Sequence, residues 1–235
     1  MKKVLLLAFL IQSLAFGETV VAIHGFLSNS YSMKPVRHML YHSGFDVCMW
    51  EYPSRQKFLG EHACHLVTTL QKIACAHPGE PISFVTHSIG ALVLRAALNQ
   101  PGCPQEAKIG RAVLIAPPSQ GSSLARSCRS VLPIAIVMGR KAGWQLMHYR
   151  PREIACNFGE FPATMRVFVI AGTKGNKIFF DKPNDGYLTV EETYLNTPFY
   201  FSAFPINHGN LLKRPEVLYC MRNFLLAAQL CEKSL

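Results

Sequence analysis

Ser88 is the residue whose sequence surroundings most clearly indicate chemistry. It stands at the centre of Thr86-His-Ser-Ile-Gly90, after the apolar run 81–85 and before residues with helical spacing. A serine at a sharp turn between a strand and a helix presents its hydroxyl to a substrate as a nucleophile. Gly90 matches the usual Gly-x-Ser-x-Gly form of this turn, whereas Thr86 replaces its first glycine. The pentapeptide therefore predicts nucleophilic catalysis at Ser88, with a tight turn at Thr86.

A serine nucleophile needs a base within hydrogen-bond reach and a carboxylate that orients this base. The best candidates are Asp185, in a predicted turn, and His208, which follows the last predicted strand. Serine, then acid, then histidine is a chain order in which such triads occur. Asp181 is a second candidate for the acid and His148 for the base, although His148 precedes Asp185. The sequence therefore predicts a triad of Ser88, Asp185 and His208.

Acyl transfer to a serine also requires donors that stabilise a developing oxyanion. The backbone N–H of Ile89 is one candidate, because it follows the nucleophile directly. The loop after the first predicted strand supplies the other, for which we predict the N–H of Phe26. Gly25 would let this loop approach a substrate closely, and we expect His24 to brace the loop rather than to transfer protons.

Predicted strands and helices alternate along the chain. Strands are predicted at 18–23, 45–50, 82–86, 111–116, 166–171 and 199–204, and helices at 32–42, 58–76, 89–99 and 216–230. This alternation predicts an α/β fold with a doubly wound, mostly parallel sheet of about six strands flanked by helices. Ligands bind beyond the carboxyl ends of the strands in such sheets. His24 and Ser88 each follow a predicted strand, so we expect them to meet at one edge.

The interval 117–162 contains no clear strand pattern, but its segment 131–138 is strongly apolar. Two interpretations are equally consistent with this pattern. The segment is either part of a small cap over the site, where it would contact an acyl chain, or a helix packed into the main core.

The N-terminus has the pattern of a secretory signal peptide. Two lysines precede an apolar stretch that is too short for a comfortable membrane span, and small residues follow near Gly17. We therefore predict cleavage near Gly17, export to the periplasm or medium, and one domain over 18–235.

The formal net charge of +10 makes the chain basic. An anionic membrane surface is a partner that such a charge could favour, although a solvated basic surface is the simpler interpretation. No run of Lys and Arg is interleaved with aromatic residues, so the sequence does not favour nucleic-acid binding.

The eight cysteines contain no Cys-x-x-Cys pair, which argues against a zinc site or a thioredoxin-type motif. An exported protein could oxidise them, but the sequence does not select a pairing. Cys64 and Cys75 lie eleven positions apart on one predicted helix, which places them about 16 Å apart. A disulfide between these two residues is therefore excluded.

Taken together, these motifs give the chain a resemblance to the small bacterial lipases and esterases of the α/β-hydrolase fold. The resemblance covers nearly all of 18–235. It rests on Val21-Ala-Ile-His-Gly-Phe, Val85-Thr-His-Ser-Ile-Gly, Ala116-Pro-Pro-Ser-Gln-Gly-Ser, Asn184-Asp-Gly-Tyr-Leu-Thr-Val-Glu and Asn207-His-Gly. It implies that Ser88, Asp185 and His208 form the triad, that Phe26 and Ile89 bind the oxyanion, and that neither metal nor organic cofactor is needed. The first two strands of larger family members are missing, which suggests a minimal sheet.

The favoured interpretation is a serine hydrolase that cleaves carboxylic esters of acyl or lipid substrates. A thioesterase, amidase or acyltransferase would use the same triad, and the sequence does not distinguish these reactions. A binding module without catalysis is a third interpretation, but binding alone would not require all three triad residues.

Overall fold

The computed structural model describes residues 18–175 and 177–227, so the predicted signal peptide lies outside the described residues. Its centre is one sheet of six parallel strands in the order β2-β1-β3-β4-β5-β6. The strands are β1 (Thr19–Ile23), β2 (Asp46–Trp50), β3 (Ile82–His87), β4 (Arg111–Ile115), β5 (Arg166–Gly172) and β6 (Tyr200–Phe204). The predicted doubly wound α/β sheet is thus confirmed.

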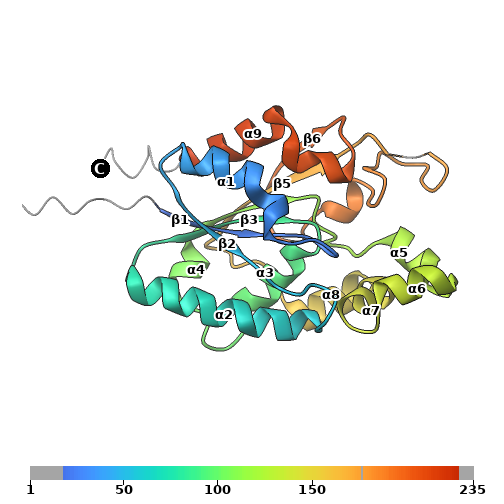
Figure 1. Ribbon diagram of the computed structural model, residues 1–235, viewed down its shortest axis with the longest axis horizontal. Coiled ribbons are helices and arrows are strands. Elements are labelled where there is room, and N and C mark those ends of the chain that lie inside the picture. The colour runs from blue at the N-terminus through green and yellow to red at the C-terminus, as the bar shows by residue number, and fades with distance from the viewer. Residues whose placement is uncertain (1–17, 176, 228–235) are drawn as a thin grey trace, which may run out of the picture.

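The sheet is covered by helices on both faces, as Figure 1 shows. On one face lie α1 and α9, and on the other lie α2, α3 and α8. The helices are α1 (Lys34–Tyr41), α2 (Leu59–Ala76), α3 (Gly90–Leu98), α4 (Glu106–Ile109), α5 (Ser123–Ser127), α6 (Leu132–Met138), α7 (Ala142–His148), α8 (Pro151–Phe158) and α9 (Pro215–Leu226). Short 3-10 helices are η1 (Ser30–Met33), η2 (Cys128–Ser130), η3 (Glu191–Thr193) and η4 (His208–Lys213).

The central strands consist of residues that favour a fully buried sheet. All five residues of β1 and all five of β4 are buried, and both strands are rich in β-branched and aliphatic side chains. Strands covered on both faces read as continuous apolar runs. The order in which strands are added to the sheet reverses after β2, because the chain returns past β1 and places β3 on the other side of it. A ligand site is expected at the carboxyl ends flanking such a reversal.

Arg111 ties the two ends of the described fold together at the opposite, amino edge of the sheet. It opens β4, and its Nη1 atom lies 3.0 Å from Glu18 Oε2 and donates to the carbonyl oxygen of Leu225 at 3.1 Å. Glu18 also accepts a hydrogen bond from Ser83. The start of β1 and the end of α9 therefore lie at the same edge.

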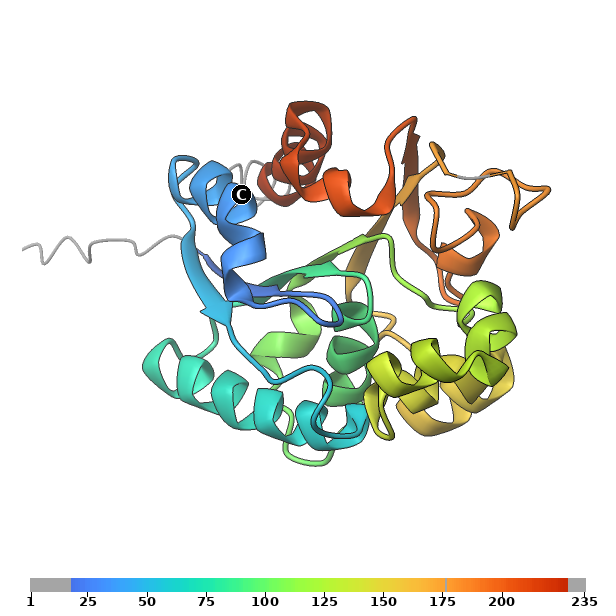
Figure 2. The ribbon, with the colours of Figure 1, turned by 45° about the vertical axis from the view of Figure 1, so that its right-hand side comes forward.

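The interval 117–162 folds into the short helices α5 to α8, which gather at the end of the molecule where the strands finish (Figure 2). None of the residues of α6 is buried. The interpretation of 131–138 as a core helix is therefore wrong, and its role as a cap stays a prediction. Among the described residues, no helix has the length and apolar character needed to cross a bilayer.

The cysteines of the described part are all unpaired. Seven are found there, as free thiols. Cys64 and Cys75 both lie on α2, as predicted, and Cys231 lies outside the described residues.

Candidate active site

Ser88 occupies a sharp turn between β3 and α3. Its φ angle is +52°, in the left-handed region that non-glycine residues seldom adopt. The backbone N–H of Ser88 donates to the carbonyl oxygen of Ile115 at 2.8 Å, which fixes the turn to the neighbouring strand β4. A conformation of this kind costs roughly 1–3 kcal/mol and persists where the surroundings impose it.

Two glycines allow the turn to pack against the end of β1. A methyl group on Gly90 would lie 2.7 Å from the carbonyl oxygen of His24 and 3.0 Å from that of Ile23. A methyl group on Gly25 would lie 3.3 Å from Ser88 Cβ. Helix α3 therefore starts directly against β1, and the loop after β1 passes beside the serine.

Thr86 is accommodated within strand β3 rather than in the turn itself. It pairs with Ile23 of β1 and Leu114 of β4, and it is fully buried. Its hydroxyl has no hydrogen-bond partner among the described residues. The threonine therefore fits the sheet, while the unusual backbone angle falls on Ser88.

Asp185 and His208 form a closely held pair. Asp185 Oδ2 lies 2.6 Å from His208 Nδ1, and the backbone N–H of His208 donates to the carbonyl oxygen of Asp185 at 2.9 Å. Asp185 Oδ1 accepts the backbone N–H groups of Tyr187 and Leu188 at 2.9 and 2.8 Å. The carboxylate is 2% exposed. This network fixes the carboxylate and leaves Nε2 of His208 free to act on another group.

The imidazole of His208 lies next to the serine turn. Its ring centroid is 4.8 Å from that of His87, the residue before Ser88, and 5.1 Å from that of Tyr187. Burial, together with the neighbouring His208, lowers the pKa of His87 to about 3. His87 is therefore neutral near pH 7, and its Nε2 lies 3.4 Å from the carbonyl oxygen of His208.

The alternative acid and base lie elsewhere. Asp181 is exposed, and the carboxylate in contact with His208 belongs to Asp185. His148 is on α7, where its Nδ1 bonds the carbonyl oxygen of Trp144 at 2.8 Å and its ring stacks on the Trp144 indole. The structure therefore brings together the acid and base that the sequence favoured.

His24 is completely buried beneath the loop after β1. Its carbonyl oxygen accepts the Tyr52 hydroxyl at 2.9 Å, and its ring stacks on the Tyr52 ring at 4.3 Å between centroids. Its Nδ1 lies 2.9 Å from the carbonyl oxygen of Gly25. These contacts are those of a residue that supports the loop.

Two backbone N–H groups near Ser88 remain available. The N–H of Leu27 is not one of them, because it donates to Ser54 Oγ at 3.0 Å. The two available groups are the N–H groups of Phe26 and Ile89, which form no hydrogen bond within the described residues. Both are adjacent to the serine turn, because Ile89 follows Ser88 and the 25–26 loop passes beside it.

A cavity of about 550 Å³ opens beside His208. It is lined by Lys174, Gly175, Asp185, Gly186, Tyr187, Asn207, His208, Gly209, Asn210 and Lys213. The two lysines make this side of the site electropositive, which suits a polar or anionic portion of a ligand.

Sequence reasoning did not single out His87 and Tyr187, although both rings pack against His208. The only indication of these contacts in the sequence was nearness to the predicted triad, since His87 precedes Ser88 and Tyr187 follows Asp185 by two positions. Nearness in sequence does not fix how a ring packs, so the contacts of these two rings were visible only in three dimensions.

Solved structures with the same fold include several lipases and esterases. Over 90% of this chain and 93% of the other, the mature lipase BlEst2 from Bacillus licheniformis is 18% identical, with a TM-score of 0.73. The metagenomic carboxyl esterase MGS0156 is 17% identical over 94% of this chain and 77% of its own, with a TM-score of 0.66. Phospholipase PlaB from Legionella pneumophila is 14% identical over 87% of this chain and 59% of its own, with a TM-score of 0.64.

No family model and no curated protein matches the sequence. The similarity therefore lies in the fold. The six-stranded parallel sheet and the turn at Ser88 give this chain the α/β-hydrolase fold, which it shares with these structures.

Proposed function

We propose that this protein is a serine hydrolase that cleaves carboxylic esters through an acyl-enzyme on Ser88. The observation that carries the proposal is the meeting of two features at one edge of the sheet. Ser88 is held at a φ of +52°, and the hydrogen-bonded pair of Asp185 and His208 lies beside it. This combination has the residue types that acyl transfer requires, in a chain order in which such triads occur.

In the proposed reaction, Ser88 Oγ attacks the ester carbonyl carbon while His208 Nε2 takes the hydroxyl proton. The carbon–oxygen bond to the alcohol then breaks, and His208 returns the proton to the departing alcohol. A water molecule, deprotonated by His208, attacks the acyl-enzyme and releases the carboxylic acid. Asp185 keeps Nδ1 of His208 protonated and stabilises the imidazolium that forms twice in each cycle.

The oxyanion of each tetrahedral intermediate would be stabilised by the N–H groups of Phe26 and Ile89. Their lack of other partners supports this role, because preorganised donors need no rearrangement during the reaction. His24 and Gly25 would hold the first donor in position, through the Tyr52 contact and the close approach to Ser88.

Acyl lipids are the substrate class that we propose. The similar structures include those of a lipase, a carboxyl esterase and a phospholipase. The apolar helix α6 lies at the same end of the molecule as the strand ends, which supports a substrate with an acyl chain (Figure 2). Export through the predicted signal peptide at 1–17 is part of the proposal, and N-terminal sequencing of the secreted protein tests it.

The first prediction is that a fluorophosphonate probe labels the wild type and leaves Ser88→Ala unlabelled. The same substitution should abolish turnover of p-nitrophenyl esters, because it removes the attacking oxygen. Ser32→Ala is the matched control, since this serine lies in η1 and its hydroxyl donates to the Asn29 carbonyl oxygen. Equal labelling of wild type and Ser88→Ala would overturn the proposal.

A series of p-nitrophenyl esters of increasing acyl length then tests the substrate class. An optimum at medium or long chains is expected for an acyl lipid substrate. Activity restricted to acetyl esters would contradict the lipid part of the proposal, while leaving the serine hydrolase part intact.

A further inference from the structure

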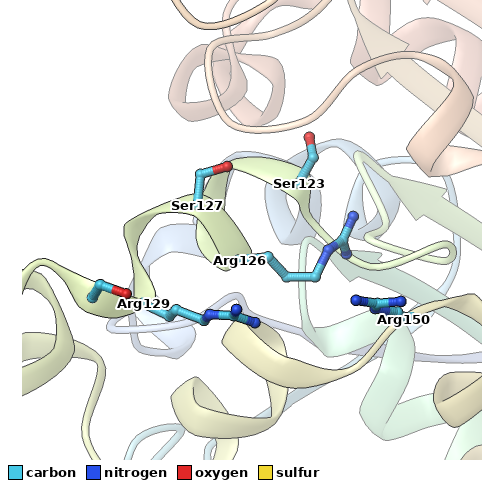
Figure 3. Close-up of a pocket in the computed structure, with 6 residues that line it drawn as sticks. Ser123, Arg126, Ser127, Arg129 and Arg150 are labelled. Atoms are coloured by element: carbon cyan, nitrogen blue, oxygen red, sulfur yellow. The ribbon is translucent and has the colours of Figure 1, made fainter.

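A pocket rich in arginine lies between α5 and the start of α8, outside the triad. Its volume is about 400 Å³. It is lined by Ser123, Arg126, Ser127, Arg129, Ser130 and Arg150, which we call the arginine pocket. Figure 3 shows the guanidinium groups of the three arginines extending toward the same hollow. None of the lining residues is acidic, so the lining carries three positive charges and three hydroxyl groups.

Most of this positive charge is not neutralised by the protein. Within the described residues, the guanidinium groups of Arg129 and Arg150 have neither a hydrogen bond nor an ion pair. Arg126 donates to the carbonyl oxygen of Tyr149 at 3.4 Å and lies 3.9 Å from Glu192 Oε1. The Glu192 carboxylate is itself engaged by the backbone N–H groups of Ser123 and Thr189, at 2.5 and 2.9 Å.

This arrangement suits a phosphate group. Arginine offers a planar set of N–H donors that matches phosphate oxygens, and serine hydroxyls supply further donors. One arginine is held in place by protein contacts while the other two are available to a ligand. The two free oxygens of a phosphodiester each carry more than one lone pair, so a single phosphate can accept from more than one arginine.

The helix next to the arginine pocket indicates where that phosphate comes from. Side chains of α6 are exposed although apolar, with Leu132 at 70%, Ile136 at 61% and Val137 at 55%. No Asp or Glu occurs between Glu106 and Glu153. The basic residues of α5 to α8 are Arg126, Arg129, Arg140, Lys141, Arg150 and Arg152.

An exposed apolar helix bordered by basic residues is typical of a surface that binds anionic membranes. A soluble phosphate compound would account for the arginine pocket but not for α6. The two features together favour a phosphate fixed in a bilayer, with acyl chains beneath it to receive α6.

The arginine pocket is also connected to the candidate active site. Ser122, the N-cap of α5, donates from Oγ to the carbonyl oxygen of Tyr187 at 3.4 Å. The Tyr187 ring packs against His208. A membrane held by α5 to α8 would therefore lie near the triad.

We propose that the arginine pocket binds the phosphate of an anionic phospholipid while α6 inserts among the lipids of the same bilayer. Docking in this way does not depend on catalysis. Only its use, the delivery of lipid esters to Ser88, rests on the proposed function.

The test measures vesicle binding by co-sedimentation in the Ser88→Ala background, where hydrolysis cannot alter the lipid. We expect binding to vesicles of phosphatidylcholine mixed with phosphatidylglycerol. Binding to vesicles of phosphatidylcholine alone should be much weaker. Arg129→Gln with Arg150→Gln should weaken binding to the anionic vesicles roughly 30-fold. Arg37→Gln with Lys72→Gln is the matched control, because it removes the same charge from α1 and α2. An equal loss in both pairs would mean non-specific attraction and would overturn the arginine pocket as a site.

A second pair, Leu132→Ser with Ile136→Ser, tests α6 without changing any charge. It should weaken binding to the anionic vesicles as well, with an unchanged thermal unfolding midpoint because α6 is not part of the core. Titration with inorganic phosphate alone distinguishes a soluble anion from a lipid. Tight phosphate binding together with vesicle binding that is insensitive to the α6 pair would overturn the proposal.

Discussion

Asp185 is the residue whose contacts best define a single chemical role. One carboxylate oxygen accepts two backbone N–H groups, which leaves the other for His208 Nδ1. The orientation of the carboxylate is therefore set by the backbone turn at 185–188. An amide in its place would keep the size but would offer His208 a donor where an acceptor is needed.

Our second prediction is that Asp185→Asn lowers kcat for ester hydrolysis by about 10⁴-fold, with little effect on KM. The change would favour the imidazole tautomer that cannot accept the Ser88 proton; the magnitude is the one known for the corresponding change in a serine protease. Steady-state kinetics on a p-nitrophenyl ester measures it. Asp181→Asn is the control, because that exposed carboxylate does not contact His208. If Asp181→Asn caused the larger loss, the assignment of the acid would be wrong.

At the scale of elements, the first turn of α3 packs against the end of β1. The absence of a side chain at Gly90 lets the first turn of α3 touch the carbonyl groups of Ile23 and His24. These are backbone atoms of a buried strand and its loop, which cannot move aside easily. The position of the helix, and with it the turn at Ser88, depends on this glycine.

We therefore predict that Gly90→Ala reduces the free energy of unfolding by about 1–3 kcal/mol and also lowers activity. Gly60→Ala is the matched control, because a methyl group at Gly60 of α2 would meet no described atom within 4 Å. It should leave stability unchanged or raise it by up to about 1 kcal/mol. Urea denaturation of both variants measures the difference, and equal stabilities would contradict the close packing at α3.

Helix α6 is fixed by its end rather than by its faces. Arg55, in the loop before α2, donates to the carbonyl oxygens of Val137 and Ile136 at 2.8 and 2.6 Å. These are among the last carbonyls of α6, which lack partners within the helix. The guanidinium group therefore holds α6 against the body of the protein.

Our fourth prediction is that Arg55→Gln makes 131–141 more sensitive to limited proteolysis, without a measurable change in the thermal unfolding midpoint. Loss of the anchor frees a segment that contributes no buried residue. Arg37→Gln on α1 is the control for the loss of one surface charge. A lowered unfolding midpoint in Arg55→Gln would indicate that α6 belongs to the cooperative core.

The strands and the large helices were predictable because their patterns follow directly from burial. The run 82–86 is buried in the sheet, and helix 58–76 was predicted to within one residue of α2.

The short helices between β4 and β5 were not predictable. The side chains of 131–138 are apolar on all sides and none of them is buried, so their pattern carries no period that marks a buried face. The triad followed from residue order, whereas the packing of His87 and Tyr187 around His208 required the tertiary structure.

For the molecule as a whole, a buried histidine makes stability depend on pH. His62 of α2 is fully buried, and neither ring nitrogen has a hydrogen-bond partner among the described residues. Burial, with a contribution from Lys57, lowers its pKa to about 4. The unfolded chain therefore binds a proton at His62 at higher pH than the folded protein does.

The fifth prediction is that His62 contributes a loss of unfolding free energy as the pH falls from about 6.5 toward 4. The slope from this one group is at most about 1.4 kcal/mol per pH unit, because unfolding takes up one proton in that range. In His62→Phe this part of the loss should disappear, as shown by urea denaturation at several pH values. His65→Gln, an exposed position on the same helix, should keep the wild-type pH dependence. An unchanged slope in His62→Phe would mean that this ring is not the group responsible.

The contacts of Arg111 have a practical consequence for handling the protein. Because Arg111 joins Glu18 to the end of α9 at the amino edge of the sheet, both ends of the fold lie away from Ser88, which follows the carboxyl end of β3. An affinity tag, a fluorescent partner or a solid support joined at either end of the described fold would leave the candidate catalytic edge pointing outward. Immobilisation through residues at either end of the described fold, near Glu18 or Leu225, is therefore expected to retain activity, while attachment through surface lysines such as Lys141 or Lys174 would obstruct it.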